Sequence, residues 1–110
     1  GSRIRGYSFT DEQTRGAIRS VFGDTGYIMC PHTAVAWLGL KRYLREHPGS
    51  GVAPVLLSTA HPCKFEEVYD QDIRSRLVYP AQVKAFGTRE KRSTRIEPDY
   101  ARLKKLLEAY

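Results

Sequence analysis

Hydrophobic residues at helical spacing mark the beginning of the chain. Thr10 and Gln13 form a capping-box pattern, in which each side chain bonds the other residue's backbone N–H at a helix start. The residues that follow at three- and four-residue intervals on one face are Thr14, Ala17, Ile18 and Val21. This spacing predicts a helix from about residue 11 to Phe22, closed by a turn between Gly23 and Gly26.

A second helix is predicted from Thr33 to Glu46. Its first half is apolar on nearly all sides and its second half is charged, which indicates a helix with a buried beginning. It should end before Pro48, because proline lacks the N–H that a helix interior needs. The preceding Tyr27–Cys30 segment is short and apolar, so the pattern fits both a brief strand and an extended segment held by Pro31.

An apolar run at Val52–Ser58 predicts a short buried strand, with Pro54 tolerated near its start. The run is followed by a polar corner and then by a helix beginning at Pro62, a residue suited to the first helical turn. In open α/β sheets, ligands bind where strands end, because helix N-termini leave free N–H groups there. The polar side chains expected at this strand end are those of Ser58, Thr59 and His61.

The helix after the corner carries its apolar residues on one face, namely Phe65, Val68 and Tyr69. The stretch from residue 74 to 94 is interrupted by proline, glycine and charges. Only two short extended pieces are expected in it, at 77–79 and 83–86.

Pro98 and Asp99 introduce a final helix that should dock as a surface helix. Its apolar side comprises Tyr100, Leu103, Leu106, Leu107 and Tyr110. Together these elements predict one compact α/β unit with a few short strands and about four helices.

Two motifs give the chain a family resemblance. The segments 57–65, Leu-Ser-Thr-Ala-His-Pro-Cys-Lys-Phe, and 30–36, Cys-Pro-His-Thr-Ala-Val-Ala, resemble motifs near the C-terminus of threonine synthase, a pyridoxal-phosphate enzyme. Their order and separation fit, and the resemblance extends less sharply from about Gly6 to Tyr110. It implies that residues 3–110 are a C-terminal segment of a larger fold-type II enzyme. Gly1 and Ser2 look like a remnant of tag removal.

The resemblance also implies roles for residues of the polar corner. The Thr59 hydroxyl would contact the pyridine nitrogen of the cofactor, and Ser58 would be a neighbouring cofactor or backbone contact. His61 and Lys64 would meet substrate or orient the loop. On the residues alone, Thr59 fits a turn cap, His61 fits a loop-fixing residue and Lys64 fits a solvated surface residue. No catalytic residue is expected in this segment, since the Schiff-base lysine belongs upstream.

Four residues invite a metal interpretation, namely Cys30, His32, His61 and Cys63. Structural zinc pairs usually leave two to four residues between ligands, whereas a single proline separates each pair here, so no metal site is expected. Two cysteines make no disulfide framework, and they should stay reduced. The sequence departs from the family at both cysteines: an acidic residue is usual at position 30 and a small one at position 63.

The function implied by the resemblance is conversion of O-phospho-L-homoserine and water to L-threonine and phosphate by the full-length enzyme. A threonine-synthase-like phospholyase on the same scaffold is the alternative that these motifs do not separate. The isolated chain is predicted to be inactive and unable to hold pyridoxal 5'-phosphate specifically. Without the remainder of the parent chain, weak self-association is expected through exposed apolar residues, namely Val35, Trp37, Val55 and Leu57.

The charge of the chain allows a second class of function. A net charge of +6 favours contact with phosphate, so a stand-alone nucleic-acid-binding module is an alternative. Its contacts would be Lys84, Arg89, Lys91, Arg92 and Arg95. The chain lacks an RNP signature and a convincing recognition helix, and no nucleic-acid partner is expected. No apolar run approaches the roughly 18 residues of a membrane span, so a cytoplasmic protein without a membrane partner is predicted.

Overall fold

The computed structural model describes residues 4–49, 51 and 53–109. Contacts divide the chain into two units, one ending at Tyr79 and the other beginning at Pro80. The division differs from the single compact unit that the sequence predicted. The first unit contains the core and the polar corner, and the second contains two helices.

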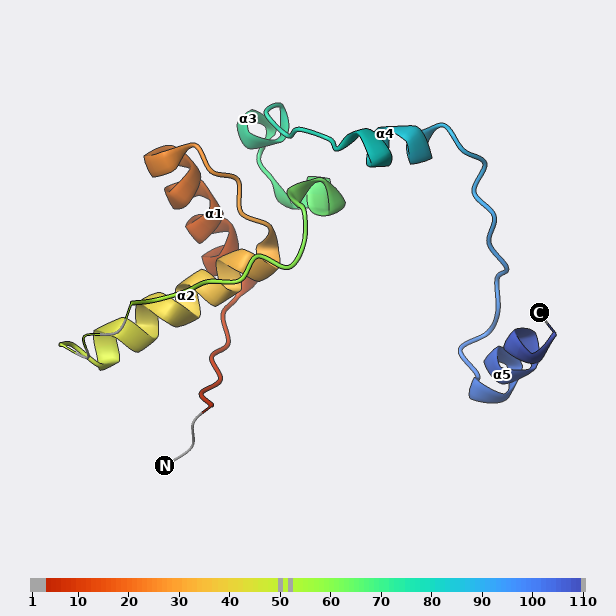
Figure 1. Cartoon of the computed structure of the whole chain (residues 1–110), viewed down its shortest axis with the longest axis horizontal. Coiled ribbons are helices and arrows are strands. Elements are labelled where there is room, and N and C mark those ends of the chain that lie inside the picture. Colours follow the sequence, from red (N-terminus) through yellow and green to blue (C-terminus); the bar gives the residue numbers. More distant parts are fainter. Residues whose placement is uncertain (1–3, 50, 52, 110) are drawn as a thin grey trace. The chain divides into compact units, whose positions relative to one another are not determined.

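All regular elements in the described ranges are helices (Figure 1). The predicted α/β class is therefore wrong. The first unit holds α1 (Asp11–Thr25), α2 (Pro31–Glu46), the 3-10 helix η1 (Pro62–Val68) and α3 (Gln71–Arg74). The second unit holds α4 (Ala81–Gly87) and α5 (Tyr100–Glu108).

Helix α1 begins at the predicted capping box. The Thr10 Oγ1 accepts from the Gln13 N–H at 3.2 Å, and the Gln13 Oε1 accepts from the Thr10 N–H at 2.9 Å. The helix runs past the predicted end through Gly23 and stops at Gly26. This glycine has φ of 73°, a left-handed conformation that glycine adopts without a Cβ clash.

Helix α2 begins two residues earlier than predicted. Cys30 is the N-cap residue, and Pro31 follows in the first turn, where its missing N–H costs nothing. The helix ends at Glu46, and the C-cap residue His47 donates its backbone N–H to the Tyr43 carbonyl at 3.0 Å. The predicted stop before Pro48 is confirmed.

The core of the first unit lies where α1, α2 and the segment after η1 meet. Its buried residues are Ala17, Ile18, Met29, Ala34, Tyr69 and Ile73. Tyr69 donates its hydroxyl to the Met29 carbonyl at 3.1 Å, which ties the extended 26–30 segment to the end of η1. Burial raises the pKa of the Tyr69 hydroxyl, so it stays protonated as a donor.

The predicted strand at Val52–Ser58 is absent from the described part of that range, and Val52 itself lies outside the described residues. The segment is extended and runs beside α2 (Figure 1). Val55 and Leu57 are 79% and 76% exposed, whereas Leu56 is half-buried. A strand needs a second strand to bond its backbone groups, and the described residues contain none.

Three further elements differ from prediction. The helix after Pro62 is a 3-10 helix with a kink at Phe65, where φ is −134°. Residues 83–86, predicted to be extended, lie inside α4. The four-residue helix α3 was not predicted, although its buried Ile73 completes the core.

Helix α5 begins as predicted, because the Asp99 Oδ1 accepts from the Arg102 N–H at 2.9 Å. Its apolar side faces solvent within the described part of the second unit, with Tyr100 79% exposed and Leu107 also exposed. The predicted docking is therefore not found within this unit, and Tyr110 lies outside the described residues.

Candidate functional site

A cleft of about 620 Å³ lies among three loop segments of the first unit. Its walls are residues 26–28, which follow α1, residues 58–62, which lead into η1, and residues 76–78, which follow α3. Three of the four predicted site residues line it, namely Ser58, Thr59 and His61. The polar corner is therefore at a cleft, although the described residues contain no strand to place it there.

Thr59 presents a hydroxyl that no hydrogen bond of the described residues uses. The residue is exposed and lines the cleft, and its side chain has no hydrogen-bond partner among the residues that the structure describes. The interpretation of Thr59 as a turn cap is not supported by any such bond. A free hydroxyl can donate to or accept from a bound group.

The Ser58 side chain is hydrogen-bonded to a residue of α2. The Thr33 hydroxyl donates to the Ser58 Oγ at 3.1 Å, and Thr33 is itself 1% exposed. The Thr33 Oγ1 also lies 3.2 Å from the Cys30 Sγ, which accepts from the Thr33 N–H at 3.5 Å. These hydrogen bonds among Cys30, Thr33 and Ser58 join the N-terminus of α2 to the wall of the cleft.

His61 lines the cleft and also organises the loop. It is the N-cap residue of η1, and its Nδ1 accepts from the Cys63 N–H at 3.2 Å. This acceptor role places the proton of the neutral ring on Nε2. Both predicted roles remain compatible, because the loop contact uses only one ring nitrogen.

Lys64 is the predicted site residue that the structure separates from the others. It is exposed and does not line the cleft, and its backbone N–H donates to the His61 carbonyl at 3.2 Å. Its side chain fits the interpretation as a solvated lysine at the start of a short helix.

Arg76 was not predicted, and it lines the cleft from the opposite wall. Its guanidinium lies 6.0 Å from the centre of the Phe22 ring and forms no ion pair with any carboxylate of the described residues. The sequence offered no signal for it, because Arg76 is one of many basic residues in the second half of the chain. Only the return of the chain after α3 brings it to the cleft.

A polar brace supports the wall formed by residues 76–78. The Glu66 carboxylate accepts from the Tyr79 hydroxyl and from the Arg74 guanidinium, the latter at 2.8 Å. The bond from Tyr79, followed by that from Arg74, lowers the pKa of Glu66. The same carboxylate raises the pKa of Tyr79. The brace joins η1, α3 and the end of the first unit.

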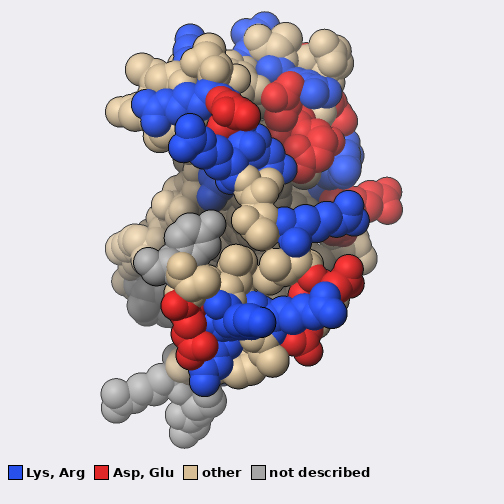
Figure 2. Space-filling model, turned by 90° about the vertical axis from the view of Figure 1, so that its right-hand side faces the viewer, with Lys and Arg blue, Asp and Glu red and all other residues tan. Residues whose placement is uncertain are grey.

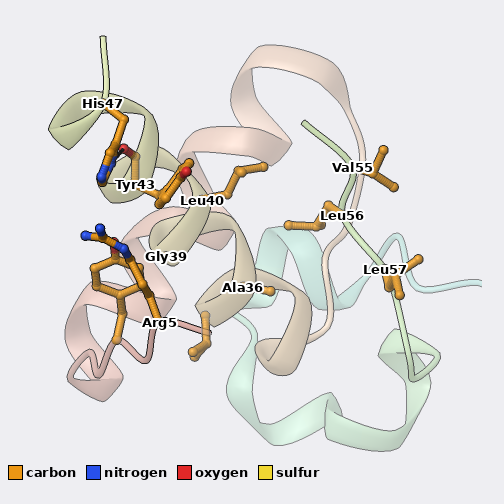
Figure 3. A pocket seen from close by; sticks show the side chains of 11 residues that line it. Arg5, Ala36, Gly39, Leu40, Tyr43, His47, Val55, Leu56 and Leu57 are labelled. Carbon is orange, nitrogen blue, oxygen red and sulfur yellow. Dashed lines mark hydrogen bonds between the residues drawn. The ribbon is translucent and has the colours of Figure 1, made fainter. Parts of the chain in front are cut away.

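A second hollow of about 740 Å³ lies along α2 (Figure 3). Leu56 points toward the helix, whereas Val55 and Leu57 point away from it. At the other end, the Tyr43 and His47 rings stack with centres 4.3 Å apart. This hollow is mainly apolar on the side of the extended segment, and the described residues that line it include no serine or threonine. We call it the α2 groove.

The predicted exposure of apolar residues is confirmed for three positions. Val35, Val55 and Leu57 are exposed, and all three line the α2 groove. Trp37 is instead half-buried against the core, and the Lys41 ammonium lies 5.7 Å from its ring.

The thiol and imidazole groups do not form a metal cluster within the described ranges. Cys30 is buried and Cys63 half-buried, and both are free thiols.

Basic and acidic side chains are interspersed on the face drawn in Figure 2. Among the described helices, none has the length and hydropathy needed to cross a membrane.

Comparison with known sequences identifies the family. The profile of the family described as "Threonine synthase, C-terminal" matches residues 33–107. Threonine synthase of Escherichia coli (strain K12) is 30% identical over 93% of this chain and 23% of the relative. Threonine synthase of Pseudomonas aeruginosa is 32% identical over 86% of this chain and 20% of the relative. No solved structure gives a significant match.

The chain belongs to the threonine synthase C-terminal family, as the resemblance of its two motifs predicted. Threonine synthase of Buchnera aphidicola subsp. Baizongia pistaciae is 33% identical over 74% of the chain and 18% of the relative. The chain thus spans about a fifth of the length of these relatives. The matched region contains the whole 58–62 wall of the cleft and the Thr33 side chain beneath it.

Proposed function

We propose that this chain is the C-terminal part of a lyase that converts O-phospho-L-homoserine and water to L-threonine and phosphate. Membership of the threonine synthase C-terminal family supports the reaction class. The observation that carries the assignment of the site is the Thr59 hydroxyl, which lines a cleft within the matched region and has no partner among the described residues.

The chemistry of the cleft fits pyridoxal 5'-phosphate as the cofactor of the longer protein. When bound, this cofactor supplies an electron sink for reactions at amino-acid carbons. Thr59 would hold the ring nitrogen, because a neutral hydroxyl can partner that atom in either protonation state. Ser58 would contact the bound group from the adjacent position.

The other cleft residues have supporting roles in this proposal. His61 orients the 58–62 loop through Nδ1 and leaves Nε2–H for a phosphorylated amino-acid substrate. Arg76 is a cation without an ion-pair partner in the described part of the chain, and its planar guanidinium suits a carboxylate or phosphate. The lysine that bonds the cofactor would come from the remainder of the parent chain.

The test is an assay of the full-length protein with O-phospho-L-homoserine and pyridoxal 5'-phosphate. Release of threonine and phosphate in equal amounts is the expected result. Phosphate release without threonine would replace the synthase with the phospholyase alternative. Absence of both products from a folded protein that has bound cofactor would refute both reactions.

The nucleic-acid alternative has a separate test. Its basic residues lie in the second unit and are exposed, but Glu90 lies among them. We expect no binding of random oligonucleotides by this chain at low salt, where phosphate contacts are strongest. Salt-sensitive binding that is lost when Lys91 and Arg92 are replaced by glutamine would revive that function.

A further inference from the structure

We propose that Cys30 and Thr33 are positioning residues that make the Ser58 hydroxyl a hydrogen-bond donor into the cleft. The inference rests on the proposed function for the identity of the bound group, but its first step concerns only the folded chain. The buried Cys30 and Thr33 side chains would thus act as positioning groups, and the Ser58 hydroxyl would act as a donor toward the cleft.

The number of protons that the three side chains can donate sets the direction of the hydrogen bonds between them. A hydroxyl can donate only one hydrogen bond, and the Thr33 hydroxyl donates its bond to the Ser58 Oγ at 3.1 Å. Thr33 therefore cannot donate to sulfur as well, so the 3.2 Å contact is a bond from the Cys30 S–H to the Thr33 Oγ1. The Cys30 Sγ in turn accepts the Thr33 N–H at the start of α2.

This arrangement leaves one proton unused. Ser58 accepts from Thr33, and its own O–H has no acceptor among the described residues. Ser58 lines the cleft, so that proton is available to an acceptor atom of a bound group. The two residues behind it are each 1% exposed, which keeps water from competing for the bonds that orient Ser58.

The side chain at position 30 decides the direction of the hydrogen bonds that link Cys30, Thr33 and Ser58. A thiol can donate a proton to Thr33, whereas an ionised carboxylate can only accept one. An aspartate would cap α2 equally well, but its carboxylate would accept the hydrogen bond that the Thr33 hydroxyl donates. Ser58 would then donate back to Thr33 and present only an acceptor to the cleft. Cys30→Asp should therefore reverse the direction, and Cys30→Ser should preserve it.

The first experiment tests the direction in the 110-residue chain without cofactor. In a Cys63→Ala background only the Cys30 thiol contributes an S–H stretching band in the infrared. We expect this band at lower frequency than in the same chain carrying Thr33→Val, because donation to an oxygen weakens the S–H bond. Equal frequencies in two folded proteins would overturn the proposal.

The second experiment measures pyridoxal 5'-phosphate binding by the full-length protein. Thr33→Val and Cys30→Asp should each weaken binding about fivefold, the effect of one hydrogen bond, whereas Thr33→Ser and Cys30→Ser should stay within about twofold of the unchanged protein. Absorbance of the bound cofactor gives an independent readout. If Cys30→Asp fails to fold, the Thr33 pair carries the test.

A double-mutant cycle separates positioning from a general structural effect. In a Ser58→Ala background, Thr33→Val and Cys30→Asp should cause no further loss of cofactor binding, because the oriented proton is already absent. An undiminished loss in that background would overturn the proposal. Failure of the unchanged full-length protein to bind cofactor would refute the proposed function, while the infrared result would still decide the direction of the bonds.

Discussion

The Thr59 hydroxyl is exposed to the cleft and forms no bond in the described part of the chain, so replacing it should leave folding intact. In the full-length protein, Thr59→Val keeps the shape of the side chain and removes its hydrogen bond to a bound group. We expect about fivefold weaker binding of pyridoxal 5'-phosphate and an unchanged melting temperature of the cofactor-free protein. Thr59→Ser, which keeps the hydroxyl, is the matched control, and equal binding by the valine and serine variants would contradict the role.

Glu66 connects protonation to the stability of the cleft wall. Its pKa lies below the ordinary 4.5 because Tyr79 and Arg74 donate to its carboxylate in the folded state. A carboxyl group with a lowered folded pKa stabilises the fold above its unfolded pKa, and this stabilisation is lost as pH falls through the folded pKa. Below pH 4.5, acid should therefore loosen the brace that holds residues 76–78.

Tyr79→Phe tests this brace directly, because it removes the first of the two donors and little volume. The carbon-13 titration of the Glu66 carboxyl should shift upward toward 4.5 in the variant. Tyr27→Phe, on an exposed tyrosine outside the brace, should leave it unchanged. An identical Glu66 titration in Tyr79→Phe would show that the hydroxyl does not set the pKa.

At the scale of a single element, α1 offers two glycines with opposite expectations. Gly23 lies within the helix and Gly26 caps it with φ of 73°, and an added Cβ would meet nothing within 4 Å at either position. Gly23→Ala should stabilise the chain by about 0.5–1 kcal/mol, since alanine favours a helix interior. Gly26→Ala should destabilise it by about 1 kcal/mol, because the left-handed conformation strains a residue with a Cβ.

Urea denaturation of the two variants measures both effects on the same element. The unchanged chain should lie between them, so the sign of each change is read without reference to absolute stability. Two variants displaced in the same direction would contradict the end of α1 at Gly26.

At the scale of the whole molecule, the chain represents about a fifth of its relatives, and the α2 groove is open to solvent. Val55 and Leu57 on its rim should cause weak, concentration-dependent self-association of the isolated chain. Sedimentation velocity should show this association reduced by Leu57→Asp. Ser20→Asp, which adds the same charge at an exposed polar position of α1, should not reduce it. Equal effects of the two variants would assign the change to net charge.

The isolated chain should also fail to bind pyridoxal 5'-phosphate specifically. One or two hydroxyl contacts, each worth about 1 kcal/mol, do not replace a phosphate cradle and a covalent lysine. Borohydride reduction followed by peptide mapping should find scattered, substoichiometric labelling of surface lysines. Stoichiometric labelling of a single lysine would mean that the chain contains a complete cofactor site.

The candidate site residues were predictable to different degrees. Ser58, Thr59 and His61 came from a motif, and all three line one cleft because they are neighbours in sequence. Lys64 belongs to the same motif but lies outside the cleft, since the turn of η1 carries it away. Arg76 had no local signal and depends on the path of the chain after α3.

The sequence by itself determined the starts of α1 and α5 and the stop of α2 before Pro48, because the caps and bonds at these helix ends join residues three or four positions apart. Thr10, Gly26 and Asp99 act as caps in the structure for the same local reasons that made them recognisable in the sequence. Only the tertiary structure decided the state of the 53–58 segment and the contact between Thr33 and Ser58. An apolar run becomes a strand only when a second strand bonds its backbone, and a polar side chain joins a site only when distant segments meet.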